Sequence, residues 1–170
     1  MAEALPLSES ELQLLESLVR HRVRFMVVGL SAAALQGAPV VTEDVDLWFE
    51  DLSDPKLSRA LQAVGAAYAP PFDQNPPMLA GPHSEPFDVV VSMSGLGTFA
   101  EEVKHARQIR VGQVRLNVLS LERILASKTA ANRPKDLLVI PVLRNVLRTL
   151  QAKQSRRTKT RPAKQRTTNR

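Results

Sequence analysis

The stretch FMVVGLSAAALQGAPVVTEDVDLWFE, residues 25–50, decides the fold. Its first apolar run ends at a glycine, an alanine-rich segment follows, and the triplet Asp-Val-Asp then opens a second apolar run. This order predicts a strand, a glycine turn, a short helix and a second strand. Side chains alternate along a strand, so Asp44 and Asp46 are expected on the same face. Two carboxylates on one strand face are hard oxygen ligands that suit Mg²⁺ beside a phosphate.

A third acid follows at the start of another apolar run. The segment FDVVV, residues 87–91, predicts a buried strand with Asp88 near its beginning. Three carboxylates on two neighbouring strands are sufficient to hold two metal ions. Such ions lie roughly 3.5–4 Å apart and stabilise both the attacking and the leaving oxygen of an in-line displacement.

With these residues the chain resembles the nucleotidyltransferase superfamily of the DNA polymerase β type. It is most similar to small bacterial proteins related to the nucleotidyltransferase toxins of abortive-infection systems. Their pattern is a strand, a glycine followed by Gly or Ser, roughly a dozen residues, Asp-x-Asp and a later third acid. The matching residues are Gly29, Asp44, Asp46 and Asp88, and the likeness covers about residues 23–150.

The likeness continues at LERILASKTAANRPKDLLVI, residues 121–140. Related proteins often carry a helix with a lysine here, followed by an Arg-x-Lys-Asp turn, and the corresponding positions are Lys128, Arg133, Lys135 and Asp136. The residues alone leave an alternative open for each. Lys128 also fits a lysine favoured by the dipole at a helix end, and the other three fit a charged helix start.

One departure from the family pattern lies in the glycine turn. Leu30 follows Gly29 directly, and Ser31 comes one place later than the small residue that the family uses near the triphosphate. Either Ser31 takes that role after a shift of one residue, or phosphate binding is weakened.

The resemblance implies transfer of a nucleoside monophosphate from a nucleoside triphosphate to an acceptor hydroxyl. It implies two Mg²⁺ ions, with Asp44 and Asp46 serving the triphosphate and Asp88 serving the acceptor and its proton. It further implies that the nucleotide is bound by Gly29, Ser31, Lys128, Arg133 and Lys135. A toxin-like activity on RNA or protein, with a cognate antitoxin as partner, belongs to the same expectation.

Two other functional classes fit the sequence. One is a catalytically silent nucleotide-binding or partner-binding module of the same fold, which the altered glycine turn favours. The other is a nucleic-acid-binding accessory protein that acts through its basic end. Residues 153–170 hold eight of the 23 Lys and Arg residues and no acid, so they favour RNA or another polyanion.

Composition and pattern predict one α/β (or α+β) domain over residues 1–150, with a small mixed sheet flanked by helices, and a disordered basic tail over residues 151–170. The chain has no cysteine, signal-peptide pattern or apolar run long enough to cross a membrane, so we expect a cytoplasmic protein. Residues 66–86 hold six of the twelve prolines and predict a long extended loop. C-terminal helices are expected at 120–131 and 136–150, the second interrupted or restarted at Pro141.

Overall fold

The structure, a computed structural model, describes residues 7–159 and contains one seven-stranded mixed sheet. The strand order is β3-β4-β5-β2-β1-β7-β6. The pairs β1–β7 and β2–β5 are parallel, and the other neighbours are antiparallel. The strands are β1 Phe25–Val28, β2 Val45–Phe49, β3 Ala67–Ala69, β4 Met78–Ala80, β5 Phe87–Val90, β6 Ala106–Val111 and β7 Val114–Leu119.

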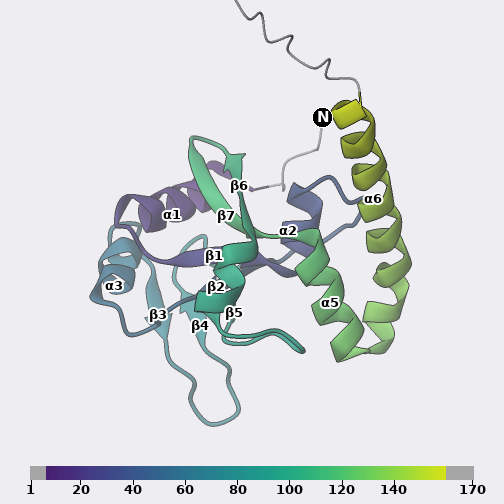
Figure 1. Cartoon of the computed structure of the whole chain (residues 1–170). Helices are drawn as coiled ribbons and strands as arrows, with labels where there is room; N and C mark the ends of the chain where they lie inside the picture. Colours follow the sequence, from purple (N-terminus) through teal and green to yellow (C-terminus); the bar gives the residue numbers. More distant parts are fainter. Residues whose placement is uncertain (1–6, 160–170) are drawn as a thin grey trace, which may run out of the picture.

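In the described part of the chain, six helices and one 3₁₀ turn flank this sheet (Figure 1). In Figure 1, α1 and α3 lie at one end of the molecule, and α5 and α6 lie side by side at the other. Their bounds are α1 Glu9–Arg20, α2 Gly29–Leu35, α3 Pro55–Gln62, α4 Phe99–Glu102, η1 Val103–His105, α5 Leu121–Ala131 and α6 Pro134–Lys159. The predicted class, a small mixed sheet flanked by helices with a C-terminal helical pair, is therefore confirmed.

Local sequence signals explain where several helices begin. Ser8 and Glu11 form a capping box at the start of α1, and the Asp54 side chain accepts a hydrogen bond from the backbone N–H of Lys56 at the start of α3. Thr98 and Glu101 form a second capping box at α4. These caps satisfy backbone N–H groups that a helix start leaves without partners.

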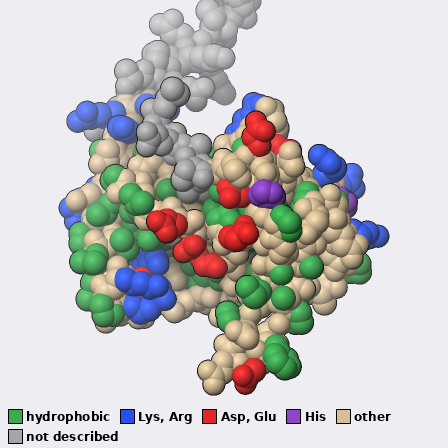
Figure 2. Space-filling view, turned by 180° about the vertical axis from the view of Figure 1, so that it is seen from behind, with side chains coloured by type: hydrophobic (Ala, Val, Ile, Leu, Met, Phe, Trp, Pro, Cys, Tyr) green, Lys and Arg blue, Asp and Glu red, His purple; other side chains and the backbone are tan. Residues whose placement is uncertain are grey.

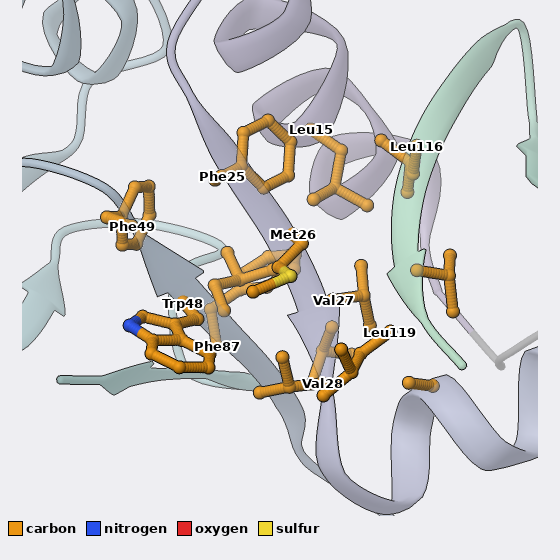
Figure 3. Close-up of a cluster of buried hydrophobic side chains, with 14 of the residues drawn as sticks. Leu15, Phe25, Met26, Val27, Val28, Trp48, Phe49, Phe87, Leu116 and Leu119 are labelled. Carbon is orange, nitrogen blue, oxygen red and sulfur yellow. The ribbon is translucent and has the colours of Figure 1, made fainter. Parts of the chain in front are cut away.

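The core lies on both faces of the central strands. All four residues of β1 are buried, although successive side chains point to opposite faces. On one face Phe25 lies against Leu15 of α1 (Figure 3). On the other face the Trp48 ring contacts that of Phe99 edge-on, with centroids 6.0 Å apart. Because β1 and β2 are covered on both faces, their positions are fixed, and so are the positions of the acidic residues that they carry.

The proline-rich segment 66–86 is not the continuous loop that its composition predicted. It contains β3 and β4, which form an antiparallel pair at the edge of the sheet. Both strands are only three residues long, and the prolines lie outside them. Proline is tolerated beside short edge strands because no ladder hydrogen bond is lost there. Short strands of this kind leave almost no period-two signal in the sequence.

The C-terminal helix is longer than expected at both ends. It begins at Pro134, passes through Pro141 without a break and continues to Lys159. Residues 151–159, expected to be disordered, are therefore helical, and the rest of the predicted tail, 160–170, lies outside the described residues. Proline at the first helical position costs nothing, and exposed Pro141 leaves its carbonyl partner open to water. Within residues 7–159 no helix is long and apolar enough to cross a membrane.

Candidate active site

Three strand ends meet where the sequence placed its acidic residues. Strand β1 runs antiparallel to β2, which pairs Val28 at the end of β1 with Asp46 at the start of β2. Strand β5 runs parallel to β2, which pairs Asp46 with Asp88. Residues in register on neighbouring strands point to the same face. Asp46 and Asp88 therefore lie side by side at one edge of the sheet, as the sequence predicted.

Asp44 lies just before β2 and completes the acidic group. It is exposed, and its backbone N–H donates to the Thr42 hydroxyl oxygen at 3.3 Å. Its charge raises the pKa of both other carboxyls. Thr42 was not predicted, and nothing in its spacing distinguishes it from an ordinary loop residue. The three acids thus lie close enough to repel one another.

The environment of Asp46 disfavours its charge. Burial, followed by the negative charge of Asp88, raises the pKa of Asp46 to about 6. The Lys128 ammonium acts in the opposite direction and lowers this pKa. The pKa of Asp88 is also raised, by burial and by Asp44. A cation bound between these carboxylates would relieve both penalties.

Gly29 is required by the position of Asp46. Its φ of +65° lies in the left-handed region, and a Cβ at Gly29 would lie 2.1 Å from the Asp46 Oδ2 atom. A side chain at this position would displace the Asp46 carboxylate. The carboxylate of Asp46 therefore lies directly over the glycine backbone, which explains why a glycine follows β1.

Ser31 does not occupy the position expected for a phosphate ligand. Its side chain is fully buried, and its hydroxyl donates to the Val28 carbonyl at 2.8 Å and accepts from the Asp46 backbone N–H at 3.2 Å. Both hydrogen-bonding roles of the hydroxyl are thus used within the turn. In this structure Ser31 fixes the backbone of β2 beside the end of β1, while Leu30 lines the cavity next to the acids.

The basic residues come from the end of α5 and the start of α6. Lys128 Nζ lies 3.1 Å from Asp136 Oδ1, and Arg133 Nε lies 2.7 Å from Asp136 Oδ2. Asp136 is fully buried, and its contacts with these cations, the Arg133 hydrogen bond foremost, hold its pKa far below the usual range. Lys135 is exposed, and its charge also lowers the pKa of Asp46.

Two cavities open beside Asp46, and both are lined by Asp46, Lys128 and Arg133. The first has a volume of about 210 Å³, and its other polar side chains are Ser92, Ser94 and Ser127. The second has a volume of about 260 Å³ and is lined by charged residues, namely Asp44, Asp46, Asp88, Lys128, Arg133, Lys135 and Asp136. Figure 2 shows Asp and Glu side chains gathered near the middle of one face, with a cluster of Lys and Arg beside them.

Several predicted site residues thus come together, and some lining residues were not predicted. All three acids, Gly29 and the three basic residues lie at these cavities, whereas the Ser31 hydroxyl faces inward. The three serines of the smaller cavity carry no sequence signal, because two follow β5 in an irregular segment and one lies inside α5.

The donor set suits a hard cation. Carboxylate oxygens are the ligands that Mg²⁺ prefers, and Asp46 and Asp88 stand paired with raised pKa values that a divalent ion would reverse. Among residues 7–159, however, no three Asp, Glu or His side chains are gathered around a single point at which one ion would sit. The fit therefore rests on paired acids with a third nearby.

Comparison with known proteins places the fold. Neither family models nor curated sequences match this chain. Among solved structures, ANT(2'')-Ia in complex with adenylyl-2''-tobramycin aligns with a TM-score of 0.54 and 15% identity, covering 84% of this chain and 88% of its own. A solution structure of the antibiotic-resistance factor ANT(2'')-Ia aligns with a TM-score of 0.51 and 14% identity, covering 89% and 96%.

A third structure gives the same result. A Thermotoga maritima protein, provisionally assigned as a nucleotidyltransferase, aligns with a TM-score of 0.52 and 18% identity, covering 81% of this chain and 89% of its own. These similarities span nearly the whole of each compared protein. They agree with the resemblance inferred from the glycine turn and the Asp-x-Asp triplet. The chain therefore has the fold of the nucleotidyltransferases.

Proposed function

We propose that this protein transfers a nucleoside monophosphate from a nucleoside triphosphate to an acceptor hydroxyl. The single observation that carries the proposal is the pairing of Asp46 with Asp88 over Gly29, with Lys128 opposite. Carboxylates crowded in this way are unfavourable for the empty protein, as the raised pKa of Asp46 reflects. An arrangement that is unfavourable without a ligand is typical of a functional site.

In this reaction the acceptor oxygen bonds to the α-phosphorus, and the bond from that phosphorus to the bridging oxygen breaks. Pyrophosphate leaves, and the acceptor proton passes to a carboxylate, for which exposed Asp88 is best placed. Asp44, Asp46 and Asp88 would hold Mg²⁺, which when bound supplies charge stabilisation to the phosphoryl oxygens. Lys128 and Arg133, which line both cavities, would neutralise the triphosphate.

The experiment is transfer of label from each α-labelled nucleoside triphosphate in the presence of Mg²⁺. Acceptors should include RNA, protein and a cationic aminoglycoside, because the compared structure contains an adenylylated tobramycin. Asp88→Asn should abolish labelling. Asp54→Asn is the matched control, since Asp54 caps α3 outside both cavities and Asn caps a helix equally well. Absence of labelling with every acceptor, including whole cell extract, would contradict the proposal.

A catalytically silent nucleotide-binding module is the second candidate, and one observation favours it. Leu30 lines the charged cavity where the family pattern has a small residue, and the Ser31 hydroxyl is buried. Titration of Mg²⁺ and each nucleotide against the protein distinguishes the two candidates. Tight binding without turnover in any acceptor mixture would support the silent module, and a toxin role with an antitoxin partner would then lose its basis.

A further inference from the structure

Asp136 is a buried carboxylate whose partners all carry N–H donors. Its side chain is 1% exposed, and it accepts from Lys128 Nζ at 3.1 Å, Arg133 Nε at 2.7 Å and the Arg133 backbone N–H at 3.2 Å. Burying a carboxylate is costly unless it is paired and hydrogen-bonded, and here several donors compensate. The chain therefore maintains a charge at a place where an apolar side chain would pack more easily.

The two cations that Asp136 holds are the two that line both cavities beside Asp46. Lys128 comes from the last turn of α5 and Arg133 from the turn before α6. Asn132 adopts a left-handed conformation between them, with a φ of 49°, which reverses the chain direction. Asp136 thus ties two helices together through side chains that also face the site.

Stability alone does not explain this arrangement. A buried ion pair is often no more stabilising than apolar residues of the same volume, but it fixes the direction of the groups involved. A lysine has a long flexible side chain that must be ordered when it binds phosphate, and ordering it beforehand removes that cost from binding. The side chain of Lys128 is 15% exposed, so it is held in place while still reaching the cavities.

We propose that Asp136 is a positioning residue that orients Lys128 and Arg133 toward the phosphates of the bound nucleotide. This inference rests on the proposed function. The alternative is a residue that only caps α6, because Asp136 also accepts the Arg133 backbone N–H and acids are favourable in a first helical turn. The two roles predict different dependence on Lys128.

A double-mutant cycle separates the two roles. The variants are Asp136→Asn, Lys128→Met and the double substitution, measured by calorimetry with the MgNTP that the wild type binds most tightly and by the KM of label transfer. Asp136→Asn should weaken nucleotide binding about tenfold, comparable to removing a group that orients metal ligands. In the Lys128→Met background the same change should cost less than about twofold, because the lysine it orients is gone.

Glu102→Gln is the matched control. Glu102 is also buried and paired with an arginine, with Arg123 Nε 2.7 Å from its carboxylate, but it lines neither cavity. It should lower the melting temperature as Asp136→Asn does and leave nucleotide affinity unchanged. Equal nucleotide affinity in the wild type and in Asp136→Asn would overturn the positioning role. So would a double variant whose loss of affinity equals the product of the losses in the two single variants, because the two residues would then act independently.

The proposal can also be tested if Asp136→Asn does not fold or if the wild type is inactive. If Asp136→Asn does not fold, Asp136→Glu keeps the charge and the helix start while moving the carboxylate, and it should weaken nucleotide binding without a matching loss of stability. Unchanged affinity in Asp136→Glu would overturn the proposal. A wild-type protein that neither binds nor transfers any nucleotide would overturn the proposed function as well, whereas an active wild type with an unaffected Asp136→Asn would overturn the positioning role alone.

Discussion

At the scale of single residues, the site combines groups that destabilise the empty protein with groups that compensate for them. Burial and the negative charge of Asp88 disfavour the ionised form of Asp46. The carboxylate of Asp136, in contrast, is stabilised by Arg133 and Lys128. The lining of the larger cavity therefore runs from acid to base to acid, from Asp46 through Lys128 and Arg133 to Asp136. A ligand that brings both a cation and phosphates would complement each part of this series.

Asp46→Asn should remove activity and raise stability at the same time. An acid whose folded pKa is raised contributes stability that is present below its unfolded pKa, 3.8, and is lost as the pH rises through about 6. The free energy of unfolding of the variant should therefore exceed that of the wild type by on the order of 1–3 kcal/mol at pH 7–8. This difference should disappear near pH 4. Nucleotide transfer should fall roughly a thousandfold or more.

Thermal unfolding and label transfer over this pH range provide the measurement. The Asp54→Asn protein serves as the reference, because its acid caps α3. A variant that melts below the wild type at pH 7 would mean that the Asp46 charge is already stabilised in the empty protein. At Mg²⁺ concentrations that do not saturate the site, transfer by the wild type should also decline as the pH falls below about 6, because a proton then competes with the metal for Asp46.

Gly29→Ala should displace the Asp46 carboxylate and strain the backbone. The new Cβ would lie 2.1 Å from Asp46 Oδ2, and the φ of +65° is strained for any residue with a side chain. We expect metal and nucleotide binding to be lost together with roughly 1–3 kcal/mol of stability. Gly37→Ala is the control, because its φ is also positive, +87°, and nothing lies near its Cβ position. Similar nucleotide affinity in both variants would contradict a steric role for Gly29.

At the scale of secondary-structure elements, the sequence was informative where signals are local. The run before Gly29 predicted β1, and the apolar run opened by the Asp-x-Asp triplet predicted β2. The sequence was uninformative about the direction in which individual side chains point. Spacing alone could not distinguish buried Asp136 from exposed Lys135, or show that Ser31 faces the backbone. Those outcomes are set by how α2 and α6 pack.

Pro141→Ala should stabilise α6 without altering the site. Proline cannot donate to the carbonyl four residues earlier, and its ring clashes there, at a cost of about 3 kcal/mol in a regular helix. Both Leu137 and Pro141 are exposed, so water offsets part of that cost. We expect a gain of roughly 1 kcal/mol, or about 2–4 °C in melting temperature. Pro55→Ala, at the first position of α3, should give no gain. A loss of stability in Pro141→Ala would mean that the proline contributes more to the folded helix than its missing hydrogen bond costs.

At the scale of the whole molecule, charge is divided between the chain's end and the rest. The full sequence carries a net charge of +6, and without residues 153–170 it holds 15 basic and 17 acidic residues, a net charge of −2. The side chains of residues 151–157 are exposed on the last turns of α6, past the apolar residues that bind this helix to the core. Of the eight basic residues, the described side chains of Lys153, Arg156 and Arg157 are therefore exposed and line neither cavity beside Asp46.

Deleting residues 153–170 should weaken binding to RNA or another polyanion while leaving nucleotide binding nearly unchanged. Eight basic residues release condensed counterions when they meet phosphates, and the remaining domain would repel a polyanion at long range. Anisotropy titrations of labelled RNA at several salt concentrations should show a steeper salt dependence for the intact protein. Replacing the eight Lys and Arg by Gln at full length is the matched control, because it removes the charge and keeps the chain. Equal affinity and salt slope in all three proteins would assign polyanion binding to Lys135, Arg133 and their neighbours at the site, whereas a large fall in melting temperature in the deletion alone would show that the end of α6 supports the fold.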